Sequence, residues 1–420
     1  MTHFIVKFSK TSTLKLRVWW TSHGATIMRF MVILMAVVAF VWLGYEFFRL
    51  LWQPNQIGFY KVHPGAIDFK LRYREVYYWF AGRPVYSLKD ATYPPASYVI
   101  LWLLQGWLEV TPAVWLWAVT SMIALGWLGY VVVRESSADT LLERVFVALI
   151  PCSMYATGAT IGNGQLIVHL LPILLTGLLL LRQRQCGWRE DILAAVLILL
   201  ALVKPNVSMP FFWLVLFVPG RLRPALLVIC GYVAMTFFAA SFQKQGIISL
   251  LHSWLARGTE ETTEFAIKWS HSNLQSWLAA LELEQWYPLA ALIALVILGG
   301  WIYCHRDRDI WFLLGVTGLV TRFWTYHGWY DDLLILPSMI ALFRTAKRGT
   351  SPDGADVIAG TLLGMSLCVM IAPGGQYLLP PPWNRLFMNI QMVVWILVLI
   401  FLLVRIRRGS PEPRKKPVGQ

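Results

Sequence analysis

Long apolar segments separated by short polar connectors fill the chain from Phe30 to Val404. Each segment is about as long as a membrane-spanning helix and ends in a charged or Pro/Gly-rich connector, as expected of helices that satisfy their backbone hydrogen bonds in lipid. Transmembrane strands would instead require strict alternation of polar and apolar residues, which this sequence does not show. The pattern therefore predicts an all-α, polytopic transmembrane bundle with about 12 spans.

The same pattern divides the chain into three regions. Residues 1–29 form a basic amino-terminal segment, residues 30–404 the transmembrane domain, and residues 405–420 a basic, proline-containing tail that we expect to be disordered. The first apolar segment, Phe30 to Trp52, is not preceded by a short apolar core with a small-residue cleavage site. It should therefore remain in the protein as an anchor.

Composition supports this class and gives an orientation. Apolar residues make up 57% of the chain, which includes 22 tryptophans, and the mean hydropathy is +0.58; a soluble domain could not bury this much apolar surface. The net charge of +14 does not indicate nucleic-acid binding, because Lys and Arg occur in short connectors. By the positive-inside rule we place these connectors in the cytoplasm: KFSKTSTLKLR, RQRQCGWRE, GRLRP, HRDRD, RTAKRG and RIRRGSPEPRKK.

The remaining connectors then lie on the outer face and contain most of the unusual polar residues. They are residues 53–95, TIGNGQ, VKPNVSMP, residues 243–286, TRFWTYHGWYDD and PGGQYLLPPPWNR. The piece from Ala96 to Val110 would be about 22 Å long as a helix, so we expect a half-span or re-entrant element there. Residues 243–286 are too long and polar for a simple turn, and we interpret them as a functional outer loop.

The first outer connector predicts an amphipathic helix in the membrane interface. Phe69, Tyr73, Val76, Tyr77 and Phe80 recur at helical spacing. Another face carries Asp68, Arg72 and Glu75. Two interpretations remain open: an anchor helix in which Asp68 pairs with Arg72, or a catalytic position for Asp68.

Several segments in a distinctive order resemble glycosyltransferase family 87, a family of the GT-C superfamily. They are DF, YYWFAGRPVYS, TYPPASYVILWL, GNGQLIVHLLPILLTGLLLLR, LVKPN, NLQSWLAAL and WTYHGWYDDLLILP. The resemblance implies inverting transfer of a hexosyl, mannosyl-type group from a polyprenyl-phosphate sugar to a lipid or glycan acceptor outside the cytoplasm. The KPN and YHGWYDD segments depart from the family pattern, so the sugar and the acceptor stay open.

The chemistry of this transfer assigns a role to Asp68. A polyprenyl phosphate is already a good leaving group and needs its developing charge stabilised, whereas an acceptor hydroxyl needs a general base. Asp68 matches the first-loop position of the superfamily's catalytic aspartate. No DxD pair accompanies it, so we expect neither a metal nor a cofactor; Asp331 and Asp332 could form an alternative metal or acid site, or mark the membrane interface.

Candidate substrate-binding residues are outer-face cations and amides. Lys204 could bind phosphate or extend to the lipid surface, and Asn163 could bind sugar or cap the following helix. We expect His169 to be a buried structural histidine. The full set is Arg72, Arg74, Asn163, Gln165, Lys204, Asn273, Gln275, Arg322 and His327, with Arg385 as a further cation.

Two other function classes remain open at this stage. A lipid or glycan transporter or flippase could have as many spans, although the sequence shows no internal repeat. A lipid-linked polymer ligase or polymerase would also act at the outer face. In each case we expect a multi-pass protein of a bacterial-type inner or plasma membrane, with no nucleic-acid partner and with cysteines that only pack.

Overall fold

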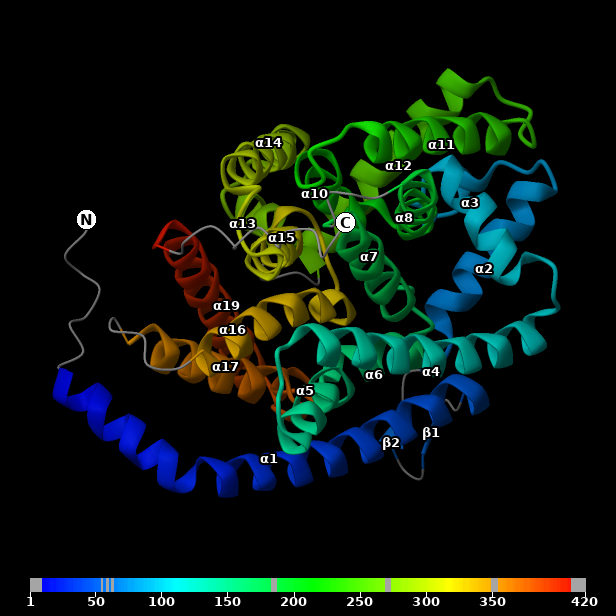
Figure 1. Cartoon of the computed structure of the whole chain (residues 1–420). Coiled ribbons are helices and arrows are strands. Elements are labelled where there is room, and N and C mark those ends of the chain that lie inside the picture. Colours follow the sequence, from blue (N-terminus) through cyan, green and yellow to red (C-terminus); the bar gives the residue numbers. More distant parts are fainter. Residues whose placement is uncertain are drawn as a thin grey trace.

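The computed structural model describes residues 10–53, 56–57, 60–61, 64–182, 187–268, 273–348 and 354–408 (Figure 1). Helices form this structure apart from one antiparallel pair of two-residue strands, β1 (Gln56–Ile57) and β2 (Tyr60–Lys61), in which Ile57 faces Tyr60. The all-α prediction is therefore confirmed for the described residues. The longer helices are α1 (Lys10–Trp52), α2 (Ile67–Phe80), α4 (Val110–Glu135), α5 (Leu141–Ser153), α6 (Tyr155–Asn163), α7 (Ile167–Leu181), α8 (Trp188–Ala201), α11 (Arg223–Ala240), α12 (Ile247–Lys268), α14 (Tyr287–His305), α15 (Ile310–Trp324), α16 (Leu336–Lys347), α17 (Ala355–Met370) and α19 (Trp383–Arg408).

Short helices and tight helical turns connect these segments. They are η1 (Val85–Ser87), α3 (Pro95–Leu101), η2 (Trp102–Gly106), α9 (Pro205–Ser208), η3 (Met209–Phe211), α10 (Phe212–Phe217), α13 (Leu274–Ala280), η4 (Glu284–Trp286), η5 (Trp329–Ile335) and α18 (Gly375–Leu378). Two of them, α3 and α9, begin at proline, whose missing N–H costs nothing in a first helical turn.

Five described helices are long and apolar enough to cross a membrane: the His23–Trp52 part of α1, α4, α11, Glu284–His305 and the Trp383–Ile406 part of α19. A sixth span is possible if α6 and α7, which meet at a bend of 116°, cross together. Shorter apolar helices include Ile310–Trp324 and Ala355–Met370. Length and composition thus support a membrane protein, and the count of about 12 spans stays a prediction.

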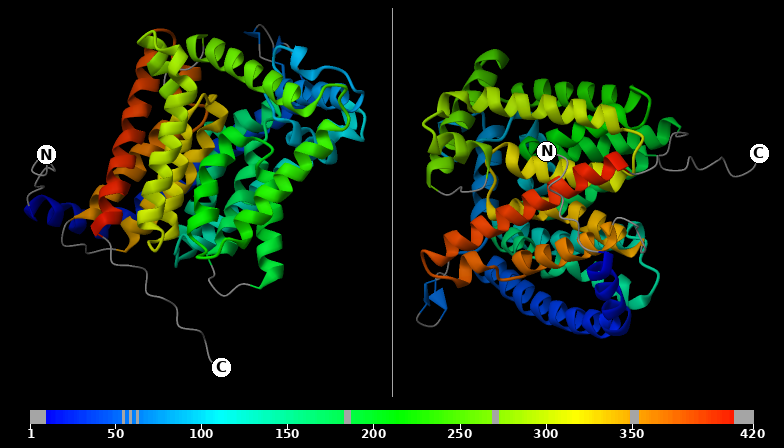
Figure 2. Two further views of the ribbon diagram at one scale, coloured as in Figure 1. Left: turned by 90° about the horizontal axis from the view of Figure 1, so that it is seen from above. Right: turned by 90° about the vertical axis from the view of Figure 1, so that its left-hand side faces the viewer.

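The bundle has two distinguishable ends. The left panel of Figure 2 shows α14 and α19 upright, with α12 lying across one end of them. At the other end, which we call the basic end, Arg182 lies 3.7 Å from Glu135, and Lys347 lies 2.9 Å from Asp139. These contacts join the α4–α5 connector to the carboxyl ends of α7 and α16, as expected if the basic connectors share one membrane face.

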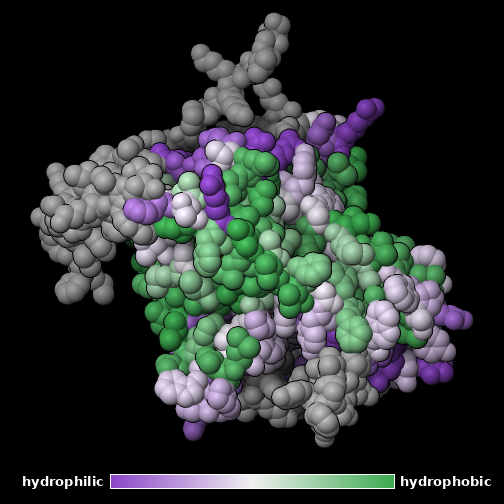
Figure 3. Space-filling model, turned by 90° about the horizontal axis from the view of Figure 1, so that it is seen from below, coloured by the Kyte–Doolittle hydropathy of each residue, from purple (hydrophilic) through white to green (hydrophobic). Residues whose placement is uncertain are grey.

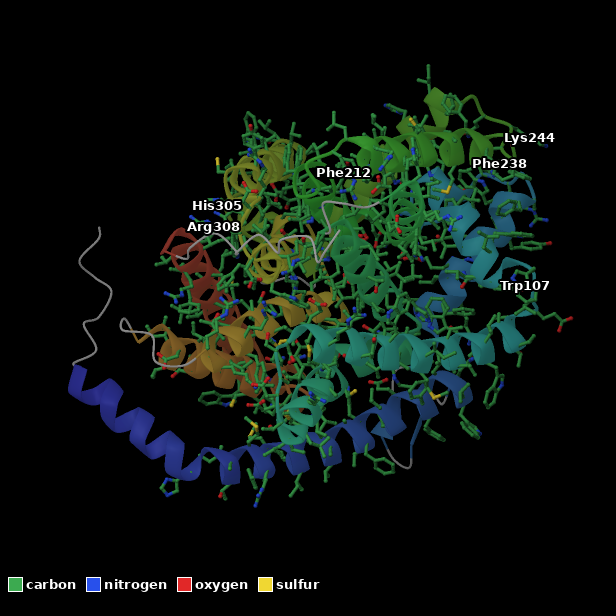
Figure 4. The ribbon with its side chains drawn as sticks, viewed as in Figure 1. Trp107, Phe212, Phe238, Lys244, His305 and Arg308 are labelled. Carbon is green, nitrogen blue, oxygen red and sulfur yellow. The ribbon has the colours of Figure 1, made fainter. Side chains whose placement is uncertain are left out.

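Apolar side chains on the rim match a lipid environment. Figure 4 places Trp107 and Phe238 at the edge of the molecule, where they are 59% and 56% exposed. The side formed by α1, α4 and α5, at the bottom of Figure 1, appears in Figure 3 as a hydrophobic band between two hydrophilic borders. An exposed apolar belt of this kind would be unfavourable in water.

Two hydrophobic cores hold the helices together. The larger includes Trp311, Trp395 and Leu313 and joins α5, α7, α8, α15, α16, α17 and α19. The smaller includes Phe69, Trp79 and Tyr98 and fastens α2 and α3 against α4 and α7. The second core fixes the helix that carries Asp68.

Two details of the predicted outer connectors need correction. Residues 243–286 are largely helical rather than a loop, because α12 and α13 occupy most of them. In α2, Phe69, Val76 and Trp79 are buried, whereas the Tyr77 side chain is 59% exposed. The segment after Pro95 forms only α3 and η2, which are together too short for a full span, in agreement with the expected half-span.

Three of the described cysteines are exposed, namely Cys230, Cys304 and Cys368, and Cys152 is half-buried. The prediction that they serve as packing residues is therefore wrong for the three exposed ones, because hydrophobic helix surfaces that face lipid also accept them. Cys186 lies outside the described residues.

Candidate functional site

The functional candidates converge where four helices begin or end. Asp68 lies in the first turn of α2, Gln165 follows α6, Lys204 precedes α9, and Asp331 lies in η5. Each of these residues lies where a helix begins or ends. At such points backbone and side-chain polar groups are not used by the helix and can form other hydrogen bonds inside the apolar bundle. We call Asp68, Gln165, Lys204, His327 and Asp331 the polar cluster.

The GNGQ motif fixes the contact between α2 and α6. The N–H of Ala66 donates to the carbonyl of Gly162 at 2.8 Å, so α2 begins directly on the end of α6. Gly164 ends α6 with a φ of +74°, and a Cβ there would lie 2.4 Å from the Cβ of Phe69. Only glycine fits both the left-handed backbone and the close approach, so Gly164 allows α2 to hold Asp68 beside Gln165.

Lys204 is buried at the centre of the polar cluster, with 7% of the residue exposed. Its Nζ donates to Oδ1 of Asp331 at 2.7 Å and to Oε1 of Gln165 at 3.4 Å, and it lies 5.0 Å from the centre of the Tyr330 ring. The alternative that Lys204 extends to the lipid surface is therefore wrong. The carboxylate of Asp331 compensates for the cost of burying the ammonium group.

Asp331 is held by two partners. Besides Lys204, it lies 3.0 Å from Nδ1 of His327. Burial alone would raise the pKa of Asp331, but Lys204 and the His327 hydrogen bond outweigh burial and lower that pKa to about 2. Burial lowers the pKa of His327 despite the nearby carboxylate, which favours the neutral imidazole. With Asp331 ionised, Nδ1 is the nitrogen that donates to it, and Nε2 has no partner in the described part of the chain.

Asp68 has a different electrostatic environment. Burial raises its pKa; the hydrogen bond from Gln165 and the positive charges of Arg72 and Lys204 oppose this rise without cancelling it. A carboxylate with a raised pKa is, once ionised, a stronger base than an ordinary aspartate. The Gln165 amide links the two sides of the cluster because it donates to Asp68 and accepts from Lys204.

A cavity of about 260 Å³ opens beside Lys204. The described residues that surround it come from the α2–α3 connector, α9, α12, α13, α14 and the loop after α15, and include Tyr93, Trp254, Gln275, Tyr287 and Tyr326. Oε1 of Gln275 and the hydroxyl of Tyr287 are buried without a hydrogen-bond partner in the described structure. An enclosure of aromatic rings and unpaired polar groups next to a cation suits a polar ligand with an anionic group.

Arg322 and Asp332 form a second buried group that sequence reasoning assigned differently. Arg322 pairs with Asp332, which also accepts from the hydroxyl of Tyr155, and Nε2 of Gln391 donates to that hydroxyl at 2.7 Å. This network joins α6, α15, η5 and α19. The structure therefore places Arg322 in an internal ion pair, and both aspartates, each 1% exposed, are buried, so the alternative that they mark the interface is wrong.

The other predicted binding residues separate into three groups. Arg72 is enclosed near Asp68, paired with Glu75 at 2.9 Å and donating to the carbonyl of Asp90 at 2.8 Å; it does not form the proposed pair with Asp68. Arg74 is exposed on α2. Gln275 lines the cavity.

The two asparagines have structural contacts. Oδ1 of Asn163 accepts from Arg49 at 2.8 Å, so Asn163 does not cap α7 as the alternative proposed. Oδ1 of Asn273 caps α13 by accepting from the N–H of Ser276 at 2.8 Å. His169 contacts Thr120 through Nε2 at 3.0 Å, in agreement with a structural role, and Arg385 lies exposed near the start of α19.

Sequence reasoning missed several residues that organise this region. Glu46 and Arg49 form a buried pair inside the first apolar segment and hold Asn163, and a charged pair in an apolar span was a visible signal. Tyr155 and Gln391 gave no such signal. Among the described residues, no three His, Cys, Asp or Glu side chains lie close enough together to hold a metal ion.

Fold and site together define a helical membrane protein with a buried ionic cluster beside a polar cavity. Comparison with family models identifies the class further: glycosyltransferase family 87 matches residues 91–337, more than half of the chain. The chain belongs to this family and is a membrane glycosyltransferase, as the resemblance implied. Comparisons with curated proteins and with solved structures gave no significant match. Asp68 lies before the matched range, whereas Gln165, Lys204 and Asp331 lie within it.

Proposed function

We propose that the protein transfers a hexosyl group, of mannosyl type, from a polyprenyl-phosphate sugar to a lipid or glycan acceptor, with inversion and with Asp68 as the general base. The observation that carries this proposal is the linkage of Asp68 to Lys204 through Gln165. It connects a base of raised pKa, through one amide side chain, to the buried cation that lines the cavity. General-base activation and phosphate stabilisation are the two tasks that this transfer requires.

Lys204 is suited to the phosphate because its hydrogen-bonding capacity is not exhausted. A lysine ammonium has three donors, and the structure directs two of them to Asp331 and Gln165. The third can reach a phosphate oxygen in the cavity that Lys204 lines. Since His327 also holds Asp331, the lysine stays oriented when the ligand leaves.

Asp68 would then act on the acceptor. As the acceptor oxygen attacks the anomeric carbon, Asp68 takes its proton, the bond from that carbon to the phosphate oxygen breaks, and polyprenyl phosphate leaves with the electron pair. One displacement of this kind inverts the anomeric configuration. No metal is part of this proposal, and metal independence stays a prediction.

The proposed site lies at the end of the bundle opposite the basic end, because α7 and α16 each run from the polar cluster to the basic connectors. By the positive-inside rule, the cluster faces the periplasm or exterior of a multi-pass, bacterial-type inner or plasma membrane. About a dozen spans would complete the bundle, with the shorter apolar helices counted among them.

The test measures release of polyprenyl phosphate from a panel of polyprenyl-phosphate sugars by the purified full chain in detergent. Asp68→Asn should lower turnover about 10²- to 10⁴-fold and retain donor binding, because removal of a nearby negative charge does not weaken anion binding. Asp90→Asn, the same change in the same connector, is the matched control and should keep near-normal turnover. Normal turnover by Asp68→Asn would refute the assignment of the base.

A further inference from the structure

A second, larger hollow lies away from the polar cluster, between α1, α4 and α5. Its volume is about 830 Å³, and its described lining is largely apolar, with Leu43 and Phe47 on α1, Met122 on α4 and Cys152 on α5 at one extremity. None of its lining residues belongs to the polar cluster or to the cavity beside Lys204. Its lining comes from α1, α4 and α5, the helices of the side that carries the hydrophobic band in Figure 3.

Small residues keep this groove open. Gly126 and Gly129 lie one turn apart on α4 and line it, and a Cβ built on either glycine would meet no atom within 4 Å. Ala148 and Cys152 are one turn apart on α5 and supply the facing wall. The open space is therefore a consequence of side-chain size on two neighbouring helices.

The groove ends in two cations that have no acidic partner among the described residues. Together with Asp139, whose carboxylate is paired with Lys347, Arg134 and Arg144 line the groove at the basic end. Their described hydrogen bonds go to the hydroxyl of Tyr130, at 3.5 Å, and to the carbonyl of Ala138, at 3.3 Å. The carboxylates of this connector are already bound: Lys347 pairs with Asp139 and with Glu143, and Arg182 lies 3.7 Å from Glu135.

The length of the groove matches one membrane leaflet. From Met122 to Arg134, α4 rises about 18 Å at about 1.5 Å per residue, whereas one leaflet contributes about 15 Å of hydrocarbon. An apolar channel of this length, ending in two arginines whose described contacts include no carboxylate, has the shape and charge of a single anionic lipid. Zwitterionic lipids would leave the two arginines without a matching net charge.

We propose that this groove is a binding site for one anionic glycerophospholipid of the leaflet at the basic end. Its acyl chains lie along Gly126 and Gly129, and its phosphate lies between Arg134 and Arg144. This lipid is distinct from the glycosyl donor, whose phosphate is assigned to Lys204 at the opposite end. The inference depends on the groove and its charges, and not on the proposed reaction.

Native mass spectrometry of the full chain in detergent tests this site, with phosphatidylglycerol and phosphatidylcholine added separately and no sugar donor present. The wild type should retain phosphatidylglycerol in preference to phosphatidylcholine. Gly126→Leu with Gly129→Leu should reduce retention about tenfold or more through steric conflict. Arg134→Gln with Arg144→Gln should weaken phosphatidylglycerol binding roughly 30-fold and leave phosphatidylcholine binding unchanged.

Matched controls separate the groove from general lipid contact. Gly300→Leu with Gly364→Leu fills open space on α14 and α17, and Arg189→Gln removes an exposed charge at the start of α8; both should retain phosphatidylglycerol like the wild type. Equal loss in controls and groove variants, or no loss in either, would overturn the proposal. Polyprenyl phosphate that displaces phosphatidylglycerol from the groove would overturn the assigned occupant. If the Gly126→Leu, Gly129→Leu variant does not fold, the Arg134→Gln, Arg144→Gln variant still tests the proposal.

Discussion

Carboxylates occur at both ends of the bundle, but they are used differently. At the basic end, Asp309 caps α15 through the N–H of Trp311 and pairs with Arg344 and Arg348 at 2.9 and 2.7 Å. Asp191 is enclosed by Arg221 and Arg223 in the same way. Burial raises the pKa of each, but the arginines outweigh it and the net shift is downward.

Asp68 at the other end shows the opposite balance, since burial prevails and its pKa is raised. Its direct hydrogen bond comes from the neutral amide of Gln165, and the cations act on it from further away. Asp191 and Asp309, each held by two arginines, fasten helices and favour the ionised form, whereas a carboxylate supported by a neutral amide keeps more of the basicity that proton transfer needs. The comparison therefore predicts a structural role for Asp191 and Asp309, in contrast to the chemical role that we propose for Asp68.

The largest expected contrast comes from one substitution made at both ends. Asp68→Asn should lower turnover about 10²- to 10⁴-fold and leave the unfolding temperature near that of the wild type. Asp309→Asn should lower the unfolding temperature and leave turnover near that of the wild type, because Arg344 and Arg348 lose their partner while the polar cluster is unchanged. Polyprenyl-phosphate release and thermal unfolding in detergent measure the two effects; a stability loss in Asp68→Asn with normal turnover would reverse the assignments.

Lys204 provides the second test. Replacing Lys204 by Met and Asp331 by Asn together avoids leaving a buried charge alone, and it removes the charge-assisted hydrogen bond to the donor phosphate. The donor KM should rise about 10- to 100-fold, because such bonds contribute about 1.5–3 kcal/mol. The control is Arg322→Met with Asp332→Asn, which removes the neighbouring buried pair; equal donor KM values in the two double variants would contradict a specific role for Lys204.

The pH dependence tests the electrostatic part of the comparison. Asp68 must be ionised to act, so kcat/KM should fall as the pH decreases through its pKa, and this fall should occur above the ordinary aspartate value of 3.8. Lys204 lowers that pKa, so Lys204→Gln should move the acid limb to higher pH. An acid limb that stays in place in Lys204→Gln would mean that the titrating group is not Asp68.

The smallest effect should separate two arginines on α2. Arg72 is enclosed and paired with Glu75, whereas Arg74 is exposed. Arg74→Gln should change kcat/KM by no more than about twofold, as is usual for surface substitutions, and Arg72→Gln should lower it more because it leaves Glu75 buried without its cation. Kinetics with a saturating acceptor measure kcat/KM for both variants. If Arg74→Gln lowers kcat/KM as much as Arg72→Gln does, Arg74 is a substrate-binding residue after all.

Local sequence determined the helical elements. Apolar runs of helical period, prolines in first turns and the Thr140–Glu143 capping box each act within a few residues, so all-α architecture and the α2 helix could be predicted. The order of motifs also indicated glycosyltransferase family 87, and the side chains named as the base, the amide and the cation do lie together. These features depend on contacts that are close in sequence or on residue type alone.

Only the tertiary structure decided which polar groups meet. Lys204 pairs with Asp331 across 127 residues and Tyr155 bonds Asp332 across 177, so the sequence could not show that one aspartate orients the lysine while the other binds Arg322. Asn163 likewise looks available in the sequence, but Arg49 binds it across 114 residues. The physical reason is that a buried charge needs a partner, and chain order does not say which partner the packing will bring.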